Sequence, residues 1–110
     1  MKLFGDYIRE LREKQNLPLR KVAAFIDVDT SILSKIERGE RTATRENICG
    51  LADFFSINRQ ALWDDYMGEY IAKMIYREKN SNIILDTARK KTNYLKYLNQ
   101  KQAKISFKNE

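Results

Sequence analysis

Hydrophobic residues recur at helical spacing along most of the chain, with polar and charged residues between them. The first such segment covers 3–15, where apolar side chains stand three and four residues apart, and Asn16 and Pro18 then interrupt it. Further segments of the same kind lie at 19–26, 30–38, 44–55 and from Arg59 onward. Because no alternating pattern typical of a strand is present, the sequence predicts an all-α fold.

Residues suited to helix ends stand at the borders of these segments. Asp29, Thr44 and Asn58 each precede one, where their side chains can accept hydrogen bonds from the free N–H groups of a helix start. Gly39 follows the third segment and suits the left-handed conformation that ends many helices. Gly50 lies inside the fourth segment, where glycine costs helix stability, so it indicates close packing by a neighbouring helix.

An apolar stripe extends the fifth segment beyond what one small domain needs. Its members repeat at steps of four and three residues, at Trp63, Met67, Tyr70 and Met74. After polar residues at 80–82, the same rhythm resumes on a sixth helix, at Ile84, Ala88, Lys91, Leu95 and Leu98. We therefore predict a domain at 1–66 and a helical extension at 67–110. The sixth helix either folds back to complete the core of one monomer or builds a dimer interface with the fifth.

Two of the predicted helices are short and stand only three residues apart. Residues 27–29 leave room for a turn alone, and such a helix-turn-helix unit can lay its second helix in the major groove of DNA. Leu33 and Ile36, three residues apart, would face inward on that helix. The opposite face is then polar and consists of Thr30, Ser31, Ser34 and Lys35.

This polar face suits the reading of base pairs. Small hydroxyl groups let a helix approach base edges closely, and Lys35 can donate to guanine or to a phosphate. The alternative is an ordinary solvated helix face without a ligand. Charge placement favours DNA, because Arg20 and Lys21 stand in the first turn of the preceding helix, where the helix dipole disfavours cations unless a phosphate uses them. Arg38 and Arg41, around the end of the second helix, can hold the DNA backbone outside the groove.

The net charge supports a polyanionic partner only in part. The 110 residues carry 21 Lys and Arg against 15 Asp and Glu, a net charge of +6. Residues 1–68 hold 11 of each sign, so residues 69–110, with 10 against 4, carry the whole excess. A basic face on the N-terminal domain must therefore come from the placement of its charges. In the extension, the cluster at 89–91 and the tail at 101–108 are either solvated surface or contacts to flanking DNA.

Composition argues against several other functions. The chain has no histidine and a single cysteine, which removes His-based catalysis, His-containing metal sites and internal disulfides, so we expect neither a metal nor a cofactor. Cys49 lies among apolar residues, which predicts a buried, unreactive thiol. Asp64 and Asp65 are adjacent and diverge on a helix, so they form no catalytic pair. We predict a cytoplasmic protein that is not an enzyme and has no apolar run long enough for a membrane.

The residues around the predicted turn resemble a known family. The stretches similar to the Cro and phage-repressor type of helix-turn-helix protein are Leu-Arg-Glu-Lys at 11–14, Leu-Pro-Leu-Arg-Lys-Val-Ala at 17–23 and Ser-Ile-Leu-Ser-Lys-Ile-Glu-Arg-Gly-Glu-Arg at 31–41. The resemblance covers residues 3–66 and implies a compact five-helix domain with its third helix in the major groove. It implies that bases are read by Thr30, Ser31, Lys35 and additionally Ser34, and that phosphates are held by Arg38 and Arg41.

The resemblance also implies contacts near the recognition helix. The family tends to tie an arginine of the first helix to a glutamate of the third, which here are Arg12 and Glu37, so Glu37 is assigned a structural role. Leu19 departs from the family pattern, which often has a glutamine that touches the DNA backbone there. Arg20 or Lys21 would then take over that contact.

These observations predict a sequence-specific regulator of transcription, a repressor or an autoregulator, that binds a double-stranded DNA operator. A homodimer is expected because one short recognition helix reads few base pairs. The chain resembles the small regulators that accompany restriction–modification systems or phages. An alternative is an antitoxin-type DNA-binding protein whose C-terminal helices also bind a protein partner. A third possibility is a domain that uses the fold for protein interaction alone.

Overall fold

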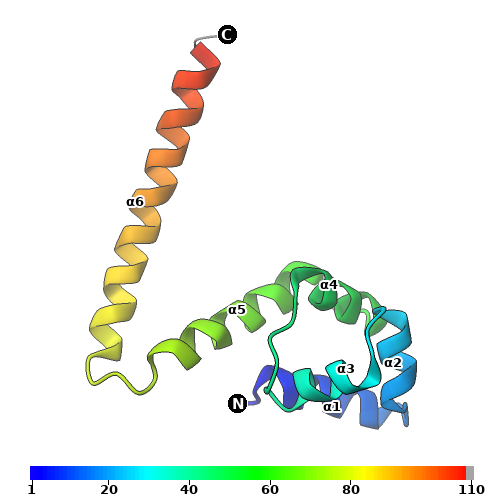
Figure 1. Ribbon diagram of the computed structural model, residues 1–110. Coiled ribbons are helices and arrows are strands. Elements are labelled where there is room, and N and C mark those ends of the chain that lie inside the picture. The colour runs from blue at the N-terminus through cyan, green and yellow to red at the C-terminus, as the bar shows by residue number, and fades with distance from the viewer. Residues whose placement is uncertain (109–110) are drawn as a thin grey trace. The chain divides into compact units, whose positions relative to one another are not determined.

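The computed structural model describes the backbone of residues 1–108 and the side chains of residues 1–104. Within this range the chain forms six helices and no strand, which confirms the predicted all-α fold (Figure 1). The helices are α1 (Phe4–Lys14), α2 (Leu19–Phe25), α3 (Thr30–Glu37), α4 (Arg45–Phe54), α5 (Arg59–Ile75) and α6 (Ser81–Lys108). The first four begin and end at, or next to, their predicted positions.

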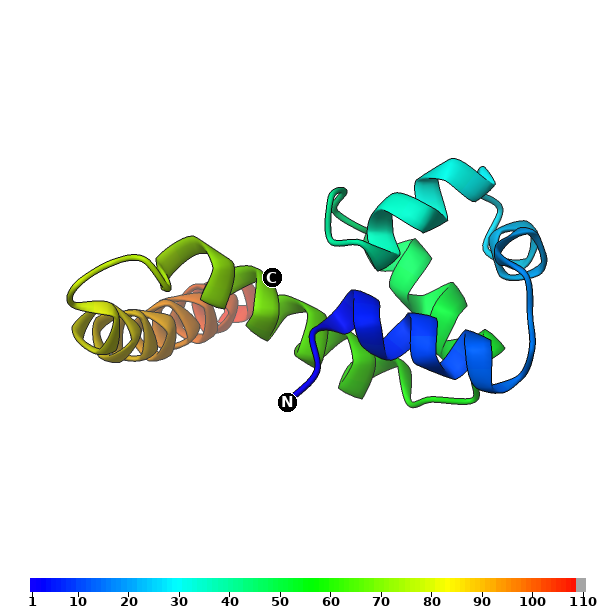
Figure 2. The same ribbon diagram turned by 90° about the horizontal axis from the view of Figure 1, so that it is seen from below.

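The chain divides into two compact units, Met1–Ala72 and Lys73–Glu110. This division falls within α5, whereas the border predicted after residue 66 separates functions and stays a prediction. In the first unit, α2 packs against both α3 and α4, and α1 packs against α3 (Figure 2). The two helices of the predicted helix-turn-helix unit are therefore held by α4 on one side and by α1 on the other.

Apolar side chains from α1 to α5 form the core of the first unit. Its largest buried members are Phe4, Ile8, Val22, Leu33, Ile48 and Leu51. Leu33 and Ile36 are 0 % and 3 % exposed, which confirms that they face inward. At the end of α2, Ile26 enters the core while Phe25 remains 57 % exposed. Ile26 is placed by Gly50, because a Cβ there would lie 2.9 Å from the Ile26 side chain. The expected close packing at Gly50 is thus present.

Cys49 differs from its prediction. Its side chain is half-buried rather than buried, at the edge of an open pocket lined by Arg45, Arg59 and Trp63, among others. The apolar residues beside it in the sequence, Ile48 among them, face the core instead. Neighbours along a helix point in different directions, so their apolar character did not decide where the thiol lies.

The first four helices end in the same way. The residue after each C-cap has a positive φ, namely Asn16 (53°), Asp27 (58°), Gly39 (73°) and Ser56 (55°). The next amide then donates back into the helix, as from Leu17 to the Arg12 carbonyl at 3.1 Å and from Glu40 to the Lys35 carbonyl at 2.9 Å. This is the Schellman arrangement, and it ends each helix sharply. Only Gly39 was predicted in this role.

The helix starts use different caps. Thr44 Oγ1 accepts from the Asn47 amide at 3.0 Å, and the Asn47 side chain accepts from the Thr44 amide at 3.1 Å. Asn58 Oδ1 likewise accepts from the backbone of the first turn of α5, so both predicted caps are confirmed. Asp29 occupies the N-cap position of α3, but its side chain makes no capping hydrogen bond. Its charge still complements the helix dipole.

A long-range contact caps α1. Leu3 stands at its N-cap and has no side-chain acceptor. The Phe4 amide instead donates to Glu69 Oε1, 2.6 Å away on α5. Because an unsatisfied amide at a helix start is costly when shielded from water, α5 completes α1 across 65 residues of sequence.

Candidate nucleic-acid interface

The inner face of α3 is fixed in the core. Leu33 and Ile36 are buried among apolar side chains, and Glu37 is buried at 5 % exposure. Gly5 of α1 lies against the end of α3 so closely that a Cβ at Gly5 would be 2.1 Å from the Glu37 carbonyl oxygen. The helix therefore has one position and one orientation relative to α1.

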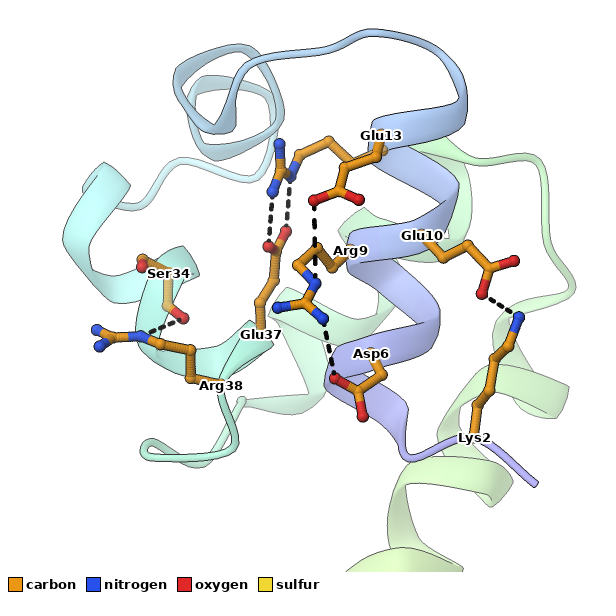
Figure 3. A network of polar contacts seen from close by, with 9 residues as sticks. Lys2, Asp6, Arg9, Glu10, Glu13, Ser34, Glu37 and Arg38 are labelled. Carbon is orange, nitrogen blue, oxygen red and sulfur yellow. Dashed lines mark hydrogen bonds and ion pairs between the residues drawn. The ribbon is translucent and has the colours of Figure 1, made fainter.

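An ion pair joins α1 to α3 beneath the predicted recognition surface. Arg12 Nε and Nη2 donate to the two carboxylate oxygens of Glu37, each at 2.9 Å, and Arg12 Nη1 donates to the Leu17 carbonyl at 2.9 Å. The side chains are 12 % and 4 % exposed. Figure 3 shows Glu37 turned toward α1 and away from Arg38. The hydrogen bonds from Arg12 to Glu37 raise the pKa of the Arg12 guanidinium, which is protonated at any ordinary pH even without this shift.

The outer face of α3 carries the polar residues that the sequence placed there. Thr30, Ser31 and Lys35 are exposed. Ser34 is half-buried, and its carbonyl accepts a hydrogen bond of 3.3 Å from Arg38 Nε (Figure 3). The exposed groups thus comprise two hydroxyls in the first turn and one ammonium group a turn later, with Ser34 at the margin.

The four predicted phosphate-binding cations stand at two places on the motif. Arg20 and Lys21 are exposed in the first turn of α2, which contains no acidic residue. Arg41 is exposed in the loop after α3. Arg38 pairs with Glu40 at 3.4 Å, and because both side chains are about half exposed this pair contributes little stability and can open to a phosphate.

Two carboxylates lie between these groups of cations. Asp27 and Asp29 belong to the turn and line a shallow groove of about 310 Å³ with Ala24, Val28 and Ile32. A phosphate would be repelled there. The helix-turn-helix motif thus has cations at its two ends and carboxylates at its turn. This separation of charge is not visible in the net charge of residues 1–68, which is zero.

Two residues with long-range hydrogen bonds in the domain were not predicted from the sequence. Tyr66 accepts a hydrogen bond of 2.8 Å from the Ala43 amide, in the loop that carries Arg41. Glu69 caps α1, as described above. Tyr66 stands three residues after Trp63 and flanks the predicted apolar stripe, but no local pattern indicates the partner of its hydroxyl.

The second unit displays both charge and apolar surface. Arg89 and Lys90 both pair with Asp86, at 3.2 Å each, while Tyr94 and Tyr97 stack with ring centroids 6.4 Å apart. Apart from Ser81, every α6 side chain from 81 to 104 is exposed. The predicted basic tail at 101–108 lies partly outside the described side chains.

None of the described helices combines the length and the hydropathy that crossing a bilayer requires. Within the same residues, His, Cys, Asp and Glu nowhere gather in threes that could hold a metal ion.

A short second helix, packed against the core on its inner face and polar on its outer face, follows a four-residue turn and has cations on both sides of it in the sequence. That arrangement defines the helix-turn-helix class of DNA-binding transcriptional regulators. The chain belongs to the helix-turn-helix family, whose model matches residues 8–62, and the predicted family is thereby confirmed.

Two solved structures are similar to this chain. The restriction-modification controller protein C.AhdI from Aeromonas hydrophila is 34 % identical, and the match covers 54 % of this chain and 89 % of that one, with a TM-score of 0.49. A complex of the SinR and SinI proteins contains a chain that is 17 % identical, with coverage of 89 % and 99 % and a TM-score of 0.50. The latter likeness supports the fold. No curated protein matches the chain.

Proposed function

We propose that the chain is a sequence-specific regulator that binds a double-stranded DNA operator and reads it with α3 in the major groove. One observation carries the proposal: the inner face of α3 is immobilised by the core and the Arg12–Glu37 pair, while Thr30, Ser31 and Lys35 stay exposed. A rigid helix with free polar groups can discriminate between bases without first becoming ordered.

The four polar residues of α3 have graded roles in this proposal. Lys35 donates to guanine O6 or N7, the commonest specific contact in the major groove. Thr30 and Ser31 offer hydroxyls that can both donate and accept at base edges. Ser34, being half-buried, contacts DNA from the margin of the face.

The cations supply affinity that is independent of sequence. Arg20 and Lys21 hold one phosphate region at the start of α2, and Arg38 and Arg41 hold another beyond α3. Arg38 exchanges its exposed Glu40 partner for a phosphate and forms a charge-assisted hydrogen bond with it. Loss of the exposed Arg38–Glu40 pair costs the protein little stability.

We further propose that a homodimer binds two half-sites and that the protein represses transcription, including that of its own gene. A single α3 of eight residues spans few base pairs, so two copies are needed for a specific operator. Membership of the helix-turn-helix family accords with a regulatory role for this chain. Because its target is DNA, we place its action in the cytoplasm of a bacterial cell, without a catalytic step or cofactor.

Selection of bound sequences from a random DNA pool, repeated at two salt concentrations, tests this proposal. A palindrome with half-sites about 10 base pairs apart, enriched at both salt concentrations, is the expected result. Weak enrichment with uniform loss of binding at higher salt would show generic phosphate attraction and contradict sequence-specific reading.

A second candidate is an antitoxin-type DNA-binding protein whose C-terminal helices bind a protein partner. The exposed apolar residues of α6 favour it, among them Ile83 at 64 %, Leu95 at 63 % and Leu98 at 40 %. A stable complex of defined stoichiometry, purified from the native host and lost on substitution of Leu95 and Leu98, would support this candidate. The full chain recovered from that host as a homo-oligomer would contradict it.

A further inference from the structure

The loop between α3 and α4, residues 38–44, carries two of the proposed phosphate-binding cations. Its first part is tied to α3, because the Gly39 and Glu40 amides donate to the Ile36 and Lys35 carbonyls at 3.1 and 2.9 Å. Its last residue, Thr44, belongs to the capping box of α4. Between these ends, Arg41 and Thr42 are exposed and make no hydrogen bond within the described residues.

A single contact fastens the unsupported part of this loop to the rest of the domain. The Ala43 amide donates to the Tyr66 hydroxyl at 2.8 Å, and Ala43 is only 9 % exposed. Among the described residues, this is the one hydrogen bond that reaches the loop from outside its two flanking helices. Tyr66 therefore sets how far the chain after Arg41 lies from α5.

The Tyr66 hydroxyl has little freedom of its own. Its ring meets Phe4 edge-on at 5.1 Å and stacks on Trp63 at 5.9 Å, and Arg45 lies 4.9 Å above the Trp63 ring. Phe4 is 2 % exposed and belongs to the core. Because the ring is packed on both sides, its hydroxyl has a fixed position. The hydrogen bond from the Ala43 amide therefore holds the loop at a fixed position relative to the core.

We propose that Tyr66 is a positioning residue for DNA binding: through Ala43 it holds the loop so that Arg41 meets a phosphate without prior ordering. The inference rests on the proposed function, in which Arg41 contacts the DNA backbone. Ordering a loop on binding reduces affinity, so a loop already ordered in the free protein favours the complex. Tyr66 acts on affinity and leaves base preference to α3.

Tyr66→Phe tests the proposal, because it keeps the packed ring and removes only the hydroxyl. In the full chain, we expect the affinity for the selected operator to fall about 2- to 10-fold, the range of one hydrogen bond. The preferred sequence should not change. Tyr70→Phe is the matched control, since Tyr70 lies one turn further along α5 and is 45 % exposed, and it should bind like the wild type.

A second background separates positioning from general stability. Arg41→Ala should weaken binding and lower the salt slope by about one, as expected for one lost phosphate contact. In the Arg41→Ala chain, Tyr66→Phe should then change affinity by less than about twofold, because the residue that it positions is gone. An equal loss in both backgrounds, or no loss in either, would overturn the positioning role.

Failure of this inference is distinguishable from failure of the proposed function. A wild-type chain that enriches no sequence and binds DNA only at low salt would overturn both. A chain that binds its operator specifically while Tyr66→Phe matches the wild type would overturn the role of Tyr66 alone. Backbone order parameters of Arg41 and Thr42 provide the structural readout, and they should decrease in Tyr66→Phe but not in Tyr70→Phe.

Discussion

Lys35 and Arg38 stand three residues apart at the end of the same helix and are proposed to meet different parts of DNA. Lys35→Ala should cost about 1 to 3 kcal/mol of binding free energy and relax preference at one base position. Arg38→Ala should weaken binding to all sequences alike and lower the salt slope by about one. Anisotropy titrations with the operator and its single-base variants measure both effects.

Lys79→Ala is the control for this pair of substitutions, because Lys79 is an exposed lysine outside the first unit. It removes the same charge and should leave base preference untouched. If Lys35→Ala bound the operator and its variants like the wild type, α3 would not be the reading helix.

Arg12 and Glu37 form the buried charge pair of the domain. Arg12→Met leaves the Glu37 carboxylate buried without its partner, which should lower the free energy of unfolding by about 3 to 5 kcal/mol. Arg12→Met combined with Glu37→Leu should regain much of that loss, since an apolar pair of similar volume replaces the two charges. Urea unfolding at neutral pH measures both. A single variant as stable as the wild type would show that the pair contributes nothing.

Single residues differ in how far the sequence could predict them. The Arg12–Glu37 pair followed from a family resemblance, since 25 residues separate the partners and no local pattern joins them. The contacts of Tyr66 and Glu69 had no such guide. The half-burial of Ser34 and Cys49 likewise depends on how neighbouring helices pack, which residue spacing along one helix does not contain.

At the scale of helices, two glycines make a matched pair. A Cβ at Gly5 would meet the Glu37 carbonyl of α3 at 2.1 Å, whereas a Cβ at Gly68 on α5 meets nothing within 4 Å. Gly5→Ala should therefore destabilise the fold by about 1 to 3 kcal/mol or more, because α1 and α3 must separate. Gly68→Ala should stabilise it by up to about 1 kcal/mol, through helix propensity alone.

Thermal unfolding of the two variants measures this difference. The substitution at Gly5 should also affect operator affinity, because α1 fixes the orientation of α3 through both Gly5 and Arg12. Gly5→Ala should weaken operator binding even at temperatures where it is folded, and Gly68→Ala should not. Equal stability of the two variants would contradict the close approach of α1 and α3.

Helix positions were predictable because two independent signals coincide at their borders. Apolar spacing located α1 to α4, and Thr44 and Asn58 marked helix starts by their capping chemistry. The ends were less visible, since Asn16, Asp27 and Ser56 adopt the left-handed conformation without being glycine. The left-handed conformation costs free energy for such residues, and the hydrogen bonds that close the helix end offset this cost. In many other sequences the same residue types do not adopt this conformation, so their presence alone does not predict a helix end.

At the scale of the whole molecule, the proposed homodimer predicts that disrupting the apolar stripe of α6 abolishes self-association and weakens operator binding. Substituting both Leu95 and Leu98 by Ser removes exposed apolar surface from one stripe of α6 and should yield a monomer in sedimentation. Operator affinity should fall by about 100-fold or more, because two linked half-site contacts become independent. The unfolding of the first unit should not change.

Ile83→Ser is the control for this double substitution, because Ile83 is 64 % exposed on α6 but lies off the stripe. It should remain a dimer with full affinity. A Leu95 and Leu98 variant that stays dimeric would place the self-association surface elsewhere on the chain.

The cap that Glu69 provides for α1 also has a consequence for synthesis on the ribosome. During synthesis, α1 lacks the carboxylate that accepts from its leading amide until Glu69 of α5 has also left the exit tunnel. A nascent chain that stalls before that point carries all of the proposed reading residues but not the contact that completes α1. The domain should therefore acquire its full resistance to proteolysis late in translation. Chains released from the ribosome before Glu69 is added should be degraded rapidly.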